Sequence, residues 1–125
     1  MSKIAYISAA FLGLTGVILG AMAAHALEKT LSADLLDSFK TGVRFQMYHA
    51  FLLFLIGLLM DKYEASWLKY ATYAVILGTL LFSGSIYLLT LTTVKVGVVT
   101  PIGGSILIVG WAFILLWAVK LKGNG

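Results

Sequence analysis

Four long runs of apolar residues, separated by short polar segments, dominate the chain. They cover about residues 4–24, 43–60, 67–91 and 102–119. A helix needs about 20 predominantly apolar residues to cross the hydrocarbon core of a bilayer, and each run is close to this length or longer. The pattern therefore predicts an all-α integral membrane protein, an antiparallel four-helix bundle with both termini on one side of the membrane.

The segment between the first two runs has a helical period of its own. Apolar side chains recur every four positions, at Leu31, Leu35, Phe39 and Val43, and charged residues take most of the places between them. This spacing predicts a short amphipathic helix over about residues 32–41, capped by Ser32. We interpret it as an interfacial helix that lies among the lipid headgroups or covers the end of the bundle. A continuation into the second span, with a bend at Gly42, is also open.

Composition agrees with a membrane protein. The 125 residues are enough for a single domain, 1–125, and 61% of them are hydrophobic but only 11% charged. Soluble domains have about 45–50% apolar and about 25% charged residues, and the mean hydropathy here is +1.01. The net charge of +4 is spread over loops and ends. It therefore suits membrane lipids and not nucleic acid. The absence of cysteine excludes disulfides and thiolate sites.

The first apolar run also resembles a secretory signal peptide, with the small residues Ala21 and Ala23 where cleavage would fall. Because the run is long enough to span a bilayer, we interpret it as the first transmembrane helix. Basic residues on the side of the termini are Lys3, Lys62, Lys69, Lys120 and Lys122, against Lys29, Lys40, Arg44 and Lys95 on the other side. The positive-inside rule then predicts a multi-pass plasma-membrane protein with cytoplasmic termini.

Small residues follow one face of the first run. Gly16, Gly20 and Ala24 repeat at a spacing of four, which lets two helix backbones approach closely in a membrane. The spacing favours packing inside the same bundle over a face for a homo-oligomer or another protein partner.

Polar side chains gather at the end where the first and third loops lie. His25 ends the first span, while Gln46 and His49 lie in the first two turns of the second and share one face of that helix. Ser83, Ser85 and Tyr87 lie in the last turns of the third span. These six residues are the predicted polar site. Arg44 points elsewhere and is predicted to contact lipid headgroups. The opposite half is predicted to be aliphatic and aromatic, with Thr15, Thr72 and Tyr73 as polar exceptions.

Four short motifs occur in these same segments. They are Gly-Ala-Met-Ala-Ala-His at 20–25, Phe-Lys-Thr-Gly-Val-Arg-Phe-Gln-Met-Tyr-His-Ala at 39–50, Leu-Phe-Ser-Gly-Ser-Ile-Tyr at 81–87 and Thr-Pro-Ile-Gly-Gly at 100–104, with Gly110-Trp111 following. The chain resembles the domain of unknown function 423 family of small bacterial membrane proteins, similar also to eukaryotic transmembrane protein 256. Met22 and Ala23 depart from the Gly-Ala-Phe-Gly-Ala-His that family members often carry. The resemblance implies a four-helix membrane protein and supplies no established activity, cofactor or catalytic residue.

These observations favour a module that is not an enzyme and that binds a lipid, a hydrophobic small molecule or a partner protein at its polar end. The first alternative is a small transporter or proton-coupled carrier that uses His49, since histidine titrates near neutral pH. A second alternative is haem ligation by His25 and His49. A serine–histidine pair without an orienting acid is a weak indication of catalysis. No catalytic residue, metal ligand or cofactor is predicted.

Overall fold

The computed structural model describes residues 1–122 and is helical almost throughout. In chain order the elements are α1 (Ser2–Ala24), the 3-10 turn η1 (Leu27–Lys29), α2 (Ala33–Lys62), α3 (Ser66–Leu91) and α4 (Val99–Lys120). Each of the four long helices has the length and apolar composition needed to cross a membrane. The predicted fold class of four transmembrane helices is confirmed.

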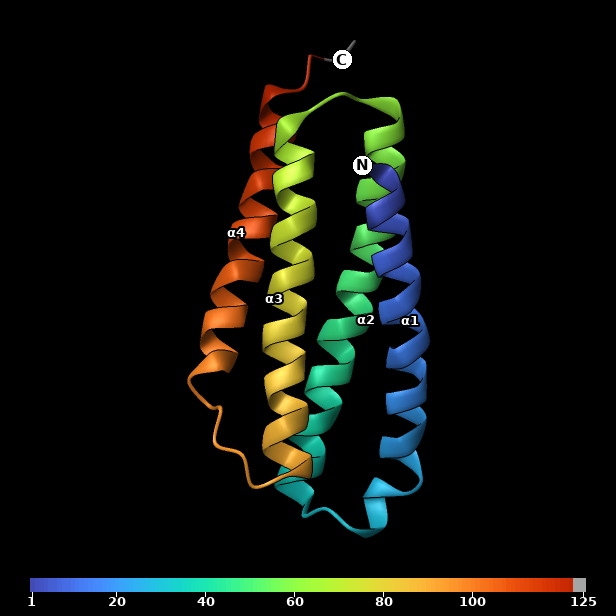
Figure 1. Cartoon of the computed structure of the whole chain (residues 1–125), viewed down its shortest axis with the longest axis vertical. Helices are drawn as coiled ribbons and strands as arrows, with labels where there is room; N and C mark the ends of the chain where they lie inside the picture. The colour runs from blue at the N-terminus through green and yellow to red at the C-terminus, as the bar shows by residue number, and fades with distance from the viewer. Residues whose placement is uncertain (123–125) are drawn as a thin grey trace.

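The helices run antiparallel and follow one another across the molecule in chain order (Figure 1). Helix α1 packs on α2, α2 packs on α3, and α3 packs on α4. Within residues 1–122, α1 and α4 do not pack on each other, so they form the two edges of an open bundle. The start of α1 and the end of α4 lie at the same end of the bundle, as four spans require (Figure 1).

The amphipathic segment is part of α2 and does not form a separate interfacial helix. Ser32 caps α2 as predicted, since its hydroxyl accepts a hydrogen bond of 3.2 Å from the Leu35 N–H. The helix then continues through Gly42 to Lys62 without interruption. Phe39 is fully buried, and its ring packs on Tyr87 of α3 with 5.0 Å between centroids. This packing holds the segment against α3 instead of flat among the headgroups.

Glycines allow the close approach of each helix pair. A Cβ atom at Gly42 of α2 would lie 2.9 Å from the Tyr87 ring of α3, and one at Gly78 of α3 would lie 2.9 Å from Leu107 of α4. On α1, a Cβ at Gly16 would collide with Met47 of α2. The small residues of α1 therefore pack inside the bundle at Gly16, in keeping with close backbone packing in membranes.

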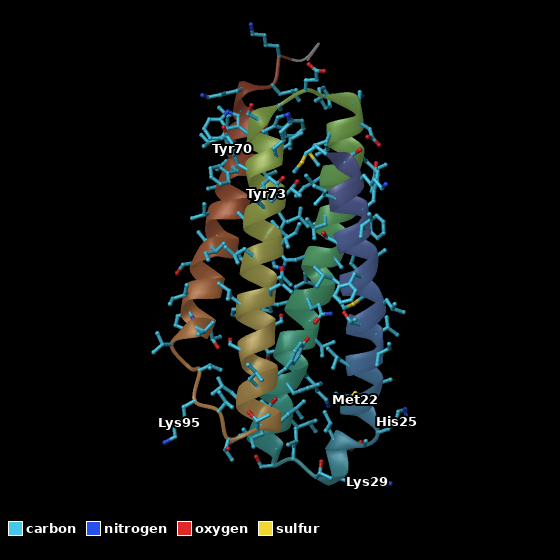
Figure 2. All side chains as sticks on the ribbon, in the orientation of Figure 1. Met22, His25, Lys29, Tyr70, Tyr73 and Lys95 are labelled. Atoms are coloured by element: carbon cyan, nitrogen blue, oxygen red, sulfur yellow. The ribbon has the colours of Figure 1, made fainter. Side chains whose placement is uncertain are left out.

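Aromatic rings mark the end of the bundle that carries the termini. Tyr63 packs on Trp117 with 5.4 Å between centroids, and the Lys120 amine lies 5.1 Å from the centre of the Trp67 ring. Figure 2 shows Tyr70 and Tyr73 towards this end, and His25, Lys29 and Lys95 at the other. Aromatic and basic side chains are typical of membrane interfaces, so the bundle spans the bilayer along its long axis.

Candidate functional site

Gln46 is the centre of a buried polar network that joins three helices. Only 4% of Gln46 is exposed. Its Nε2 donates to the Leu12 carbonyl and to the Thr15 hydroxyl of α1, both at 2.8 Å. Its Oε1 accepts a hydrogen bond of 2.6 Å from the Tyr87 hydroxyl of α3. Both amide hydrogens are thus used, and the network ties α1 and α3 to opposite sides of α2.

The partnership of Gln46 with Thr15 corrects the depth assigned from the sequence. Thr15 was expected in the opposite half of the membrane from Gln46. Because α2 begins at Ala33 and not at about residue 43, Gln46 lies in the fourth turn of its helix. It therefore reaches the middle of the bundle, level with Thr15. Ser83 and Tyr87 are four residues apart and so share a face of α3; this face could meet Gln46 across the bundle, and the Tyr87 and Gln46 side chains do meet.

His49 faces the α4 side of the bundle and has a partner on each ring nitrogen. Its Nδ1 lies 2.7 Å from the Phe45 carbonyl oxygen. Because a carbonyl oxygen can only accept a hydrogen bond, Nδ1 carries the hydrogen. Nε2 then accepts from the indole Nε1 of Trp111, at 3.1 Å. A protonated ring would carry a hydrogen on Nε2 as well, facing the indole N–H of Trp111. The arrangement therefore fits a neutral imidazole. Trp111 was not among the predicted site residues, although the Gly110-Trp111 motif already marked it.

Ser83 and Ser85 connect α3 to its neighbours. Ser83 donates to the Gly42 carbonyl of α2 at 2.7 Å. Ser85 bonds the Phe82 carbonyl at 3.0 Å and the Thr100 hydroxyl of α4 at 2.5 Å. Ser83 therefore lies beside the Gln46 network, whereas Ser85 lies on the face towards α4.

His25 and Arg44 lie outside these contacts. His25 is exposed at the C-terminal cap of α1, and Figure 2 shows it on the side of the molecule away from α4. Arg44 is exposed, and its Nη2 donates to the Thr41 hydroxyl at 2.9 Å. The structure therefore brings Gln46, Tyr87 and Ser83 together, places His49 and Ser85 towards α4, and leaves His25 apart.

A pocket of about 570 Å³ opens at the end where the first and third loops lie. It is formed by the start of α2, the end of α3 and the start of α4. Its walls are Leu35, Asp37, Ser38, Thr41, Ile86, Leu89, Thr90, Gly97, Thr100 and Pro101. Half of these residues carry a hydroxyl or a carboxylate, and the rest are apolar or glycine. The pocket is therefore amphipathic.

A second pocket, of about 390 Å³, lies nearer the middle of the bundle between α2 and α4. It is lined by Phe45, His49, Pro101, Gly104, Ser105, Leu107, Ile108 and Trp111, so that Pro101 belongs to both. On α2 the walls of the two pockets include Asp37, Thr41, Phe45 and His49 at a spacing of four, which is one face of a helix. We call the two pockets together the α2–α4 groove.

The chemistry of the α2–α4 groove changes along its length. Its outer pocket carries one carboxylate and several hydroxyls, whereas its inner pocket is mainly aromatic and aliphatic. No group of three His, Cys, Asp or Glu side chains gathers anywhere in residues 1–122 in a way that would hold a metal ion. The groove suits an amphipathic molecule, with one polar and one apolar end.

The fold and the groove define a multi-pass membrane protein of four helices with an amphipathic groove at one end. The sequence model of the family described as "Protein of unknown function (DUF423)" matches residues 19–104. The chain belongs to this family.

Curated relatives match over nearly the whole chain. The UPF0382 inner membrane protein YgdD of Escherichia coli K12 is 36% identical over 125 residues, which cover 99% of this chain and 95% of YgdD. The UPF0382 membrane protein YwdK of Bacillus subtilis is 39% identical over 126 residues, covering 94% of this chain and 98% of YwdK. No solved structure matches the chain. The names of the relatives agree with the membrane location predicted from the four apolar runs.

Proposed function

We propose that the protein is a non-enzymatic membrane module that binds a phospholipid in the α2–α4 groove. The lipid headgroup occupies the outer pocket, and an acyl chain lies along the inner pocket between Phe45 and Trp111. One observation carries this proposal: the two pockets share Pro101 as a wall residue, and the pocket at the loop end carries more polar side chains than the one farther in.

The dimensions and walls of the groove support a lipid. Sites for small molecules are typically about 300–1,000 Å³, mostly apolar, with a few polar groups that fix orientation. Each of the two pockets falls within this range. Phe45 of the inner pocket packs on Phe82 at 4.7 Å between centroids, which gives that pocket an aromatic wall. Arg44, exposed beside Thr41, is the proposed contact for the lipid phosphate.

The hydrogen bonds of the serines and histidines support a binding role over catalysis. A serine nucleophile requires a base within hydrogen-bond reach. Ser83 and Ser85 bond instead to backbone carbonyls and Thr100, and His49 bonds to Phe45 and Trp111. Protonation of His49 would also place a donor opposite the Trp111 indole, so the contact weighs against a proton carrier at this position. His25, exposed at the end of α1, is poorly placed to ligate haem together with His49.

A variant that fills the inner pocket tests the proposal. Ser105 is exposed and lines this pocket, and its hydroxyl bonds only to Pro101 of its own helix. Ser105→Phe would place a ring in the groove at small cost to the fold. Val109→Phe, on the same helix at a residue that is 46% exposed and does not line the groove, is the matched control.

The measurement is native mass spectrometry of protein extracted gently from its membrane. The natural chain and Val109→Phe are expected to retain bound phospholipid, and Ser105→Phe is expected to lose most of it while keeping its helical circular dichroism. Equal retention by all three proteins, or no retained lipid in the natural chain, would contradict the proposal.

A further inference from the structure

We propose that the outer pocket of the α2–α4 groove selects phospholipids whose headgroup carries a primary amine. The inference rests on the proposed function, because it names the class of lipid that the same groove takes.

The outer pocket has one charged residue in its walls, Asp37, and a second at its rim, Arg44, which bonds Thr41. Asp37 is the single charged side chain among the ten residues that line the outer pocket. It is exposed on α2, one turn before Thr41. A carboxylate at the mouth of a lipid pocket attracts a cationic headgroup and repels an anionic one.

The hydroxyl hydrogens of the three threonines that line the pocket, Thr41, Thr90 and Thr100, are already used within the protein. Thr41 donates to the Asp37 carbonyl at 3.1 Å, and Thr90 donates to the Ile86 carbonyl at 2.9 Å. Ser85 lies 3.0 Å from the Phe82 carbonyl, to which it donates. Thr100 therefore supplies the hydrogen of the 2.5 Å contact between Thr100 and Ser85.

The three threonines and Asp37 are consequently rich in acceptors. A hydroxyl oxygen that has donated its hydrogen keeps lone pairs, and an ionised carboxylate only accepts. Such walls are complementary to a group with several N–H donors and a positive charge. A primary ammonium has three donors and no acceptor. A quaternary ammonium has the charge without the donors, and a phosphoglycerol headgroup lacks the positive charge.

The phosphate does not distinguish between these lipids, because all three carry it. Arg44, whose guanidinium bonds Thr41 at the rim of the pocket, is available to the phosphate of each. Selection among them therefore depends on the amine and on Asp37. An exposed ion pair changes an equilibrium only modestly, by about three- to fivefold at most, and this is the size of preference expected here.

The test measures binding of three synthetic lipids to the full chain, delipidated in detergent, by titration and native mass spectrometry. The probes are phosphatidylethanolamine, phosphatidylcholine and phosphatidylglycerol with identical acyl chains. The natural chain is expected to bind phosphatidylethanolamine about three- to fivefold more tightly than the other two. Asp37→Asn is expected to abolish this preference. Asp34→Asn, which removes an exposed carboxylate of the same helix that does not line the pocket, is expected to keep it.

The outcomes separate the two proposals. If all three lipids bind the natural chain equally and Ser105→Phe weakens all of them, the groove binds lipid and the headgroup inference is overturned. A preference for phosphatidylethanolamine that survives in Asp37→Asn also overturns it. If Ser105→Phe leaves the binding of every lipid unchanged, the proposed function itself fails.

Discussion

The indole of Trp111 donates a hydrogen bond of 3.1 Å to Nε2 of His49 and so joins α4 to α2. The two helices otherwise pack on α3 and not extensively on each other. Both residues line the inner pocket of the α2–α4 groove. The hydrogen bond therefore fixes the ring positions that shape the groove, and it fixes the tautomer of His49.

Trp111→Phe tests this hydrogen bond. The variant keeps an aromatic ring but leaves His49 Nε2 without a donor, and hydrogen bonds between membrane helices average about 0.6 kcal/mol with a maximum of about 1.7 kcal/mol. We expect the free energy of unfolding in mixed micelles to fall by about 1 kcal/mol. Trp117→Phe, at a ring that packs on Tyr63, is the control. A loss no larger than that of Trp117→Phe would contradict the role of the hydrogen bond.

Tyr87→Phe tests the network of Gln46. It removes the hydroxyl that donates to Gln46 Oε1 at 2.6 Å, so we expect a loss of unfolding free energy of about 0.6–1.7 kcal/mol. Tyr73→Phe should change it by less, since Tyr73 is 55% exposed and its hydroxyl contacts only the Met1 sulfur, at 3.7 Å. Equal effects of the two substitutions, measured by the same unfolding titration, would show that the network contributes little.

Gly103→Ala tests the close packing of α3 and α4. A Cβ at Gly103 would collide with the backbone of Phe82, which cannot yield as a flexible side chain can. We expect a loss of about 1–3 kcal/mol, the usual cost of overpacking. Gly84→Ala is the control, because nothing lies within 4 Å of its added Cβ. Its unfolding free energy should stay the same or rise by up to about 1 kcal/mol, as alanine favours a helix.

The proposed cytoplasmic location of the termini can be tested with single cysteines, because the chain has none of its own. Gly97 lies in the loop before α4, with open space around its Cβ position, and Glu64 lies in the loop between α2 and α3. In intact cells a membrane-impermeant maleimide is expected to label Gly97→Cys and not Glu64→Cys. After lysis it should label both. The reverse pattern in intact cells would place the termini outside.

The four helices could be predicted from the sequence, because the length of an apolar run is read directly from consecutive residues. The sequence was not sufficient for the depth of the polar residues, which depended on where α2 begins. Phe39 and Gly42 bury that segment against α3, a tertiary contact that periodicity does not reveal. Helix faces indicated that the stripe carrying Tyr87 could face Gln46, but the bond between the two side chains is seen only in the structure. The sequence did not indicate Trp111 of α4 as the partner of His49, because the order of the helices across the bundle is set by tertiary packing.

The length of α2 determines where the outer end of the α2–α4 groove lies relative to the membrane surface. With 30 residues, α2 is about 45 Å long, whereas the hydrocarbon core of a bilayer is about 30 Å thick. Even with an ordinary tilt, α2 therefore projects beyond the acyl chains, and its first turns form one wall of the outer pocket. A molecule in the α2–α4 groove thus has its polar end in contact with the aqueous boundary, from which soluble reagents can reach it without entering the membrane.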